Sequence, residues 1–211
     1  MDNVKKDYFL LGTIVLADPI GRLVIYHLPL TLGGQQFCSV ILWSLISLLC
    51  LQQLQETNQM EIWRVERPRL MSILWTVVGF FALYYWLVTI ARYIPTTENE
   101  TRIDTVYASL SGLSKLGYIL WASLLGPIVE EVIYRGWVMK RFEKWSRYGL
   151  SCLWSAFLFA LGHMHGFRPL EMLPYFGMGL IFAFLFQKTK KIYAPMILHI
   201  VWNTLVTIAN L

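Results

Sequence analysis

Apolar runs close to the length of a bilayer recur along almost the whole sequence and constrain its fold more than any other feature. About 20 apolar residues let a helix cross the hydrocarbon core. Inside lipid the backbone must form its hydrogen bonds within its own segment, which favours helices. The composition agrees, since 56% of the 211 residues are hydrophobic and 15% are charged. The sequence therefore predicts an all-α, polytopic transmembrane helical bundle with about seven spans, at 8–30, 36–54, 70–90, 115–139, 148–163, 171–186 and 192–208.

The basic residues lie in short clusters between these runs, and their distribution predicts an orientation. With the N-terminus inside, the inner regions (1–7, 55–69, 140–147 and 187–191) hold twelve Lys and Arg residues and the outer regions hold four. Lys and Arg are enriched in cytoplasmic loops. We therefore expect a multi-pass protein of the cell membrane with a cytoplasmic N-terminus and an extracellular C-terminus. The same bias accounts for the formal net charge of +5, so we expect the lipid bilayer, and not nucleic acid, as a partner.

Local composition predicts several smaller features. The stretch 92–104 is net acidic and predicts a loop, and 107–114 predicts a short surface helix. Gly177 and Gly179 predict close approach of their span to a neighbouring helix. No small-residue cleavage site follows the basic N-terminus, so we expect the first span to be retained as an anchor. The cysteines lie in apolar stretches without metal-ligand spacing and are interpreted as buried hydrophobic residues. They are Cys38, Cys50 and Cys152.

One apolar run, 115–139, contains two acidic residues and an arginine. A charge at the centre of a membrane helix costs about 2.5–3.5 kcal/mol on insertion scales, so it is kept where it pairs, faces a polar interior or carries out chemistry. Glu131 and Arg135 are four residues apart with the acid first, which predicts an ion pair on one helix face. Glu130 points roughly 100° away and has no such partner, which makes it the candidate for chemistry. Pro127 predicts a bend or a new helix start just before the glutamates.

Two further spans add polar side chains at depth. His163 ends the fifth predicted span, and His199 and Asn203 are four residues apart on one face of the seventh. At about 1.5 Å per residue, Glu130 lies about 15 Å from the cytoplasmic end of its span and Asn203 about 17 Å from the end of its own. We therefore expect these side chains to meet in one intramembrane cavity.

This set of side chains favours hydrolysis. A glutamate shielded from bulk water can take a proton from a water molecule, and a neighbouring imidazole can orient that water or share the proton. A histidine and an asparagine on an adjacent helix can donate hydrogen bonds to a developing oxyanion. No serine or cysteine lies in a nucleophile setting such as GxSxG.

Two alternatives to this chemistry stay open at the level of sequence. The same side chains can form hydrogen bonds between helices without any catalysis. Glutamate and histidine are also common zinc ligands, although the sequence has no HExxH motif and His163 and His165 lack the spacing of four residues.

In their order and spacing these motifs resemble the CPBP family, the CAAX proteases and bacteriocin-processing enzymes, which is also called the Abi family. The family pattern of EExxxR, FxxxH and HxxxN stands here at 130–135, 159–163 and 199–203. The resemblance covers 115–208 and implies a metal-independent, membrane-embedded endopeptidase that uses a glutamate-activated water. It divides the chain into an N-terminal transmembrane region of about three spans, 1–114, and a catalytic transmembrane domain, 115–211, in which the C-terminal four spans form the catalytic core.

The resemblance also implies a role for each motif residue. Glu130 would be the general base, and His163 would help to hold the water. His199 and Asn203 of the third motif would form the oxyanion hole. Glu131 and Arg135 of the first motif would support the base.

The expected substrate is a membrane-associated peptide or a protein C-terminus, with or without an attached lipid. The resemblance links such enzymes to the processing of secreted peptides, signalling peptides or bacteriocins. A non-catalytic membrane scaffold or a bacteriocin self-immunity protein, which would use the polar cluster for packing or for binding a membrane-protein partner, is the alternative. An ion or proton carrier is a third interpretation, because intramembrane acidic residues and histidines also form proton relays.

Overall fold

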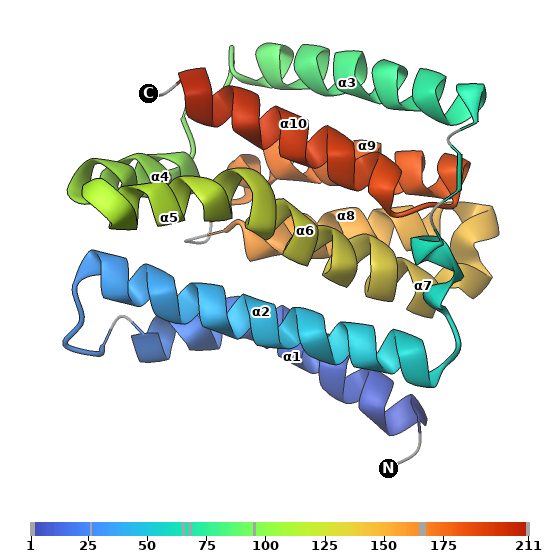
Figure 1. The fold of residues 1–211 in the computed structure, drawn as a ribbon, viewed down its shortest axis with the longest axis horizontal. Helices are drawn as coiled ribbons and strands as arrows, with labels where there is room; N and C mark the ends of the chain where they lie inside the picture. The colour runs from blue at the N-terminus through green and yellow to red at the C-terminus, as the bar shows by residue number, and fades with distance from the viewer. Residues whose placement is uncertain are drawn as a thin grey trace.

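The computed structural model describes residues 3–209 apart from 26, 65, 68, 95 and 165–167, and within that part of the chain it is helical without a strand. The longest helices are α1 (Asn3–Ile25), α2 (Leu32–Glu56), α3 (Leu70–Ile90), α9 (Met172–Thr189) and α10 (Tyr193–Ala209). Successive long helices cross the bundle in alternating directions, and the two chain ends lie at opposite ends of it (Figure 1). This arrangement confirms the predicted all-α bundle.

The bundle contains several segments of membrane length. Among the described residues, four helical stretches are long and apolar enough to cross a bilayer, namely Leu32–Glu56, Leu70–Ile90, Gly112–Arg141 and Pro169–Thr189. Two apolar helices, α8 (Leu150–Gly162) and α10, are shorter, at 13 and 17 residues. The chain is therefore a polytopic membrane protein, while the count of seven spans stays a prediction.

The glutamates lie in the middle of a helical stretch, Gly112–Arg141, so of the predicted bend or new helix start the structure shows no new start at Pro127. The stretch is made of α5 (Gly112–Leu120), the π-helical η2 (Trp121–Leu125), α6 (Gly126–Glu131), the π-helical η3 (Val132–Val138) and α7 (Met139–Arg141). Proline lacks an N–H and its ring crowds the carbonyl one turn earlier. A wider π turn directly before Pro127, in which the Gly126 N–H donates to the Trp121 carbonyl, accommodates the ring and lets the helix continue.

The segment predicted as a loop at 92–104 contains instead most of a helix, α4 (Glu98–Ser109). Thr97 and Glu100 form a capping box, in which each side chain accepts a hydrogen bond from the other residue's backbone N–H. The Thr-x-x-Glu pattern is visible in the sequence, but the polar composition of the residues after it favoured a loop. Three short 3₁₀ segments complete the fold: η1 (Met60–Trp63), η4 (Glu143–Tyr148) and η5 (Pro169–Glu171).

The predicted close helix contacts at the two glycines are confirmed. A Cβ on Gly179 would lie 2.8 Å from the Ala156 Cα of α8, and a Cβ on Gly177 would clash with the Trp86 ring of α3. The Trp86 indole N–H donates to the Pro174 carbonyl at 3.1 Å. These contacts fix α8 and α3 against α9, and α8 and α9 carry or support part of the candidate site.

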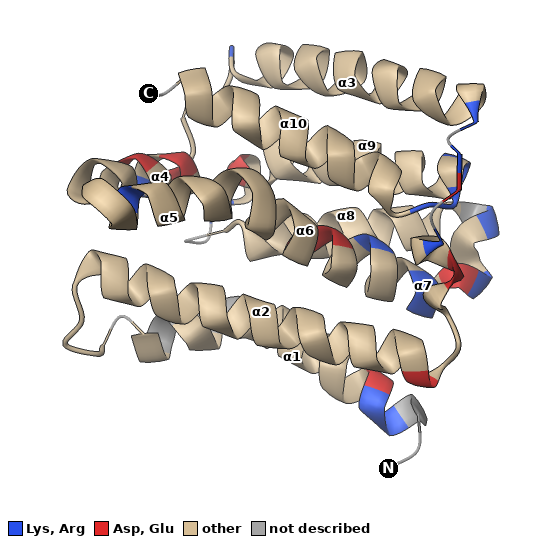
Figure 2. Ribbon diagram, viewed as in Figure 1, with Lys and Arg blue, Asp and Glu red and all other residues tan. Residues whose placement is uncertain are grey.

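Charged residues gather at the two ends of the bundle (Figure 2). Lys and Arg gather at the end that holds the N-terminus and α7, and the acidic residues of α4 lie at the opposite end. Several basic side chains are paired there, as in the contacts Lys6–Glu56 at 2.6 Å, Lys140–Glu61 at 2.7 Å and Lys191–Glu66 at 3.0 Å.

Candidate active site

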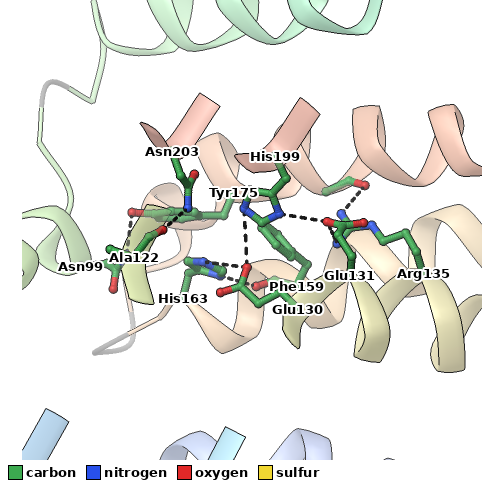
Figure 3. A network of polar contacts seen from close by, with 11 residues as sticks. Asn99, Ala122, Glu130, Glu131, Arg135, Phe159, His163, Tyr175, His199 and Asn203 are labelled. Carbon is green, nitrogen blue, oxygen red and sulfur yellow. Dashed lines mark hydrogen bonds and ion pairs between the residues drawn. The ribbon is translucent and has the colours of Figure 1, made fainter. Parts of the chain in front are cut away.

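The six motif residues converge from four elements of the C-terminal part of the bundle (Figure 3). Two glutamates come from α6 and the arginine from η3, the first histidine caps the C-terminus of α8, and α10 contributes a histidine and an asparagine. Residues separated by about seventy positions therefore come together, although those that line a cavity line two cavities and not the single cavity expected from their depths. They are Glu130, Glu131, Arg135, His163, His199 and Asn203.

Glu131 belongs to a fully buried charged network. Arg135 Nη1 lies 3.1 Å from Glu131 Oε1, and both side chains are 0% exposed. The same oxygen lies 2.9 Å from His199 Nδ1, and Arg135 Nη2 donates to the Gly179 carbonyl at 3.2 Å. The predicted Glu131–Arg135 pair is confirmed, and the contacts with His199 and the Gly179 carbonyl offset part of the cost of burying both charges.

Glu130 has a different environment, although it is the next residue. Its side chain is 26% exposed and faces a cavity. Its Oε2 lies 3.9 Å from His163 Nε2 and 3.7 Å from His199 Nε2, and it has no hydrogen-bond partner within the described part of the chain. At such separations a water molecule can bridge the polar atoms.

The orientation of His163 is set by contacts on its other side. Its Nδ1 lies 2.8 Å from the Phe159 carbonyl oxygen. A carbonyl only accepts, so Nδ1 carries the proton, and in the neutral ring Nε2 presents a lone pair toward Glu130. The imidazole stacks on the Tyr175 ring, with centroids 4.6 Å apart and an interplanar angle of 20°.

His199 is oriented in a similar way by Glu131. Glu131 Oε1 accepts a hydrogen bond from His199 Nδ1, which directs Nε2 toward Glu130. The ring also stacks on Phe182 with centroids 4.6 Å apart. His199 can therefore donate a hydrogen bond from Nε2 only when the ring carries protons on both nitrogens.

Asn203 is held by an unusual backbone acceptor. Its Nδ2 donates to the Ala122 carbonyl at 3.0 Å. Ala122 lies in the π turn η2, where the Gly126 N–H bonds instead to Trp121, so the Ala122 carbonyl has capacity for a side-chain donor. An amide nitrogen has two N–H groups, which leaves one to act in the cavity that Asn203 lines.

Two cavities meet at this site. The first, about 230 Å³, is lined by Glu130 and by residues of α1 and α2 such as Gly21 and Trp43. The second, about 290 Å³, is more apolar and is lined by His199 and by residues of α3 and α10. Both are lined by Asn99, Ile103, Tyr118, Ala122, His163 and Asn203.

No group of three His, Cys, Asp or Glu side chains in the described ranges is arranged to hold a metal ion. His165, which lacks the zinc-motif spacing with His163, lies outside the described residues.

Comparisons with known proteins find a family and relatives that match this chain. Residues 112–205 match the family model described as "Type II CAAX prenyl endopeptidase Rce1-like". This segment belongs to the Rce1-like family. The chain is 30% identical over 151 residues to "Putative membrane peptidase YdiL" of Bacillus subtilis, covering 67% of this chain and 57% of that protein. It is 23% identical over 156 residues to "Membrane-embedded CAAX protease MroQ" of Staphylococcus aureus, covering 70% and 62%.

Both curated relatives extend well beyond the segment that they share with this chain. The chain spans less than two thirds of the length of each, 57% and 62%. No solved structure matches this chain significantly. The Rce1-like segment contains all six motif residues but excludes α1 to α4, although α1, α2 and α4 line the first cavity.

Sequence reasoning missed three residues that shape the Rce1-like site. The Ala122 carbonyl was hidden because a π turn has no simple sequence signature, although a proline five residues later was a hint. Phe182 and Tyr175 look like ordinary apolar residues of their span, since stacking on a histidine from another helix leaves no local pattern.

Proposed function

We propose that this chain is a membrane-embedded endopeptidase that hydrolyses a peptide bond with a water activated by Glu130. The observation that carries the proposal is the contrast within the Glu-Glu pair. Glu131 contacts Arg135 and His199 through Oε1, whereas Glu130 faces a cavity and has two imidazole nitrogens within 4 Å, at 3.7 and 3.9 Å. The names of the family and of both relatives, which are peptidases or proteases, support the same reaction class.

In this mechanism the water lies between Glu130 Oε2 and His163 Nε2. Glu130 takes a proton from the water, and the resulting hydroxide forms a bond to the carbonyl carbon of the substrate. The carbonyl oxygen becomes an oxyanion that accepts hydrogen bonds from Asn203 and from protonated His199. Glu130 then delivers its proton to the amide nitrogen as the C–N bond breaks, which gives a carboxylic acid and an amine.

Glu131 and Arg135 act on this reaction indirectly. Glu131 accepts from His199 Nδ1, which orients the ring. Arg135 lies 3.1 Å from the same Glu131 oxygen and holds that carboxylate in place. The two residues are therefore positioning residues in this proposal.

The substrate class is inferred from the family and from the two cavities. We take it to be a membrane-associated peptide or a protein C-terminus, with or without a lipid, which lies across both cavities with the scissile bond near His163 and Asn203. The N-terminal region 1–114 supplies outer walls of these cavities through α1, α2 and α4, and 115–211 supplies the reacting groups. Processing of secreted or signalling peptides or of bacteriocins is the proposed biological setting.

The proposed orientation has the N-terminus in the cytoplasm and the C-terminus outside. The concentration of Lys and Arg at the N-terminal end of the bundle supports it (Figure 2). A reporter that is active only outside the cytoplasm, fused to the C-terminus, should be active, and activity of a cytoplasm-restricted reporter at that position would contradict the orientation.

The test of the proposed function is a comparison of the peptides in host cells that express wild type, Glu130→Gln or Glu143→Gln at matched levels. Glu143 is an exposed acid outside both cavities, which makes it a matched control. Peptide fragments should appear with wild type and Glu143→Gln and be absent with Glu130→Gln. Identical peptides in all three would favour the scaffold or immunity alternative, in which the polar cluster only packs helices.

Chelation tests the zinc alternative on the same preparation. A glutamate-activated water needs no metal, so a zinc chelator should leave the rate of peptide cleavage unchanged. Loss of cleavage that added Zn²⁺ restores would show that zinc takes part in the reaction.

A further inference from the structure

A polar cluster attaches the start of α4 to α9 beside the candidate active site. The Tyr175 hydroxyl of α9 lies 2.9 Å from Thr97 Oγ1 and accepts a hydrogen bond from Asn99 Nδ2 at 3.0 Å. Thr97 is 2% exposed and Tyr175 is 7% exposed, so these bonds are made away from bulk water, where unsatisfied polar groups are costly.

Further contacts hold the same turn of α4. The Glu98 backbone N–H donates to Glu171 Oε2 at 2.7 Å, and the Thr97 backbone N–H donates to Glu100 at 2.7 Å. The first turn of α4 is therefore held by its own capping box and by a hydrogen bond to the start of α9.

The ring of the same tyrosine, Tyr175, contacts the candidate active site. Its ring stacks on the His163 imidazole at 4.6 Å between centroids, and Phe159 contacts that imidazole at 4.5 Å. His163 caps the end of α8 and is followed directly by a non-helical residue, so helix geometry alone holds it less firmly than it would hold a mid-helix residue.

We propose that Tyr175 is a positioning residue of the hydrolysis, which holds the His163 imidazole toward Glu130 and makes that placement depend on the docking of α4. The inference rests on the proposed function. Its physical basis is that Thr97 and Asn99 fix the phenol hydroxyl, and Figure 3 shows the bond from Asn99. The phenol ring in turn stacks on His163 and limits its tilt.

The position of α4 connects the placement of Tyr175 and His163 to substrate binding. Asn99 and Ile103 of α4 line both cavities. A peptide that occupies them therefore contacts the helix whose first turn holds Tyr175. Correct seating of that peptide and correct placement of His163 depend on the same helix.

Three variants test the inference with the peptide whose cleavage depends on Glu130, synthesised with a fluorophore and a quencher. Tyr175→Leu removes the ring, Tyr175→Phe keeps the ring but loses the hydroxyl, and Thr97→Val removes one partner of the hydroxyl. Tyr85→Phe, on an exposed tyrosine of α3, controls for the loss of a phenol elsewhere.

We expect Tyr175→Leu to lower kcat about 100-fold, the order of effect that a displacement of about 1 Å has on a reacting group. Tyr175→Phe should recover most of that loss and remain about three- to tenfold below wild type, as for removal of one or two hydrogen bonds. Thr97→Val should resemble Tyr175→Phe, and Tyr85→Phe should resemble wild type. In each case KM should change less than kcat.

The outcomes separate this inference from the proposed function. If Glu130→Gln abolishes cleavage while Tyr175→Phe and Thr97→Val keep the wild-type kcat, only the role of Tyr175 is overturned, even where Tyr175→Leu does not fold. A change confined to KM, or to the melting temperature, overturns it as well, because it indicates a cavity wall or a purely structural residue. Full activity of Glu130→Gln overturns both.

Discussion

Two neighbouring glutamates on one helix have opposite surroundings. Glu131 is 0% exposed and bonded to Arg135 and His199, while Glu130 is 26% exposed, faces a cavity and lies beyond hydrogen-bonding distance of both imidazoles. Both are in the same helix at nearly the same depth, so depth in the membrane does not distinguish them. The difference teaches that partner geometry decides whether an intramembrane carboxylate holds the fold together or remains available to react.

The sharpest test of this comparison is Glu130→Gln, for which we expect the largest effect on activity. The amide cannot accept a proton from water, so peptide cleavage should fall by about 10²–10⁴-fold, the usual contribution of a positioned general base. The free energy of unfolding should stay within about 0.5 kcal/mol of wild type, because no close partner is lost. Cleavage rate and thermal unfolding in detergent measure the two quantities.

A result with the opposite pattern would break the comparison. If Glu130→Gln unfolds more easily and its surviving folded fraction cleaves at the wild-type rate, then Glu130 is the structural acid.

The complementary variant, Glu131→Gln, should affect stability most. It leaves Arg135, which is 0% exposed, as a buried charge without its carboxylate, and breaking a buried pair in this way costs about 3–5 kcal/mol. Thermal unfolding in detergent should show a much lower melting temperature than for Glu130→Gln. The double variant Glu131→Gln with Arg135→Met, which removes both charges, should recover part of the loss, and a failure to recover would indicate that the contact with His199 is the more important one.

Asn203→Ala tests whether another polar residue that lines the cavities, like Glu130, takes part in the reaction. Loss of one oxyanion donor costs about 10²–10³-fold in kcat, and the Ala122 carbonyl, its acceptor at 3.0 Å, would lose one partner. We expect kcat to fall within that range with KM nearly unchanged in steady-state kinetics. Asn203→Asp keeps the size but removes the donor and should be at least as impaired; a normal kcat in both variants would remove Asn203 from the oxyanion hole.

The sequence predicted the parts of this site that depend on spacing within one helix. The Glu131–Arg135 pair is expected from an interval of four residues, and the face shared by His199 and Asn203 is expected from the same periodicity. The apolar runs on either side indicated that all of them lie in one bundle. The roles assigned to the motif residues stay predictions.

Features that depend on contacts between distant segments could not be predicted in this way. The partner of His199 is Glu131, 68 residues earlier, and it fixes which ring nitrogen faces the cavity. The π turns around Pro127 reflect how the helix accommodates a proline in a packed bundle. Tyr175 contacts Thr97 78 residues away, and the polar composition of α4 predicted a loop where its capping box starts a helix.

The smallest effect concerns a carboxylate of the same chemistry at the water-exposed end of the bundle. Glu61 accepts from Lys140 at 2.7 Å, and its side chain is 58% exposed. The hydrogen bond from Lys140 holds the pKa of Glu61 below its ordinary value. A lowered pKa in the folded state stabilises the fold above the ordinary pKa, and this contribution is lost as the pH falls through the folded value. Exposed pairs contribute less than about 1 kcal/mol, so Glu61→Gln should be slightly destabilised at pH 7. It should match wild type once the pH lies below the lowered folded pKa of Glu61, measured by thermal unfolding. If Glu61→Gln lowered the stability as much as Glu131→Gln does, burial would not explain the difference between the exposed Glu61–Lys140 pair and the buried Glu131–Arg135 pair.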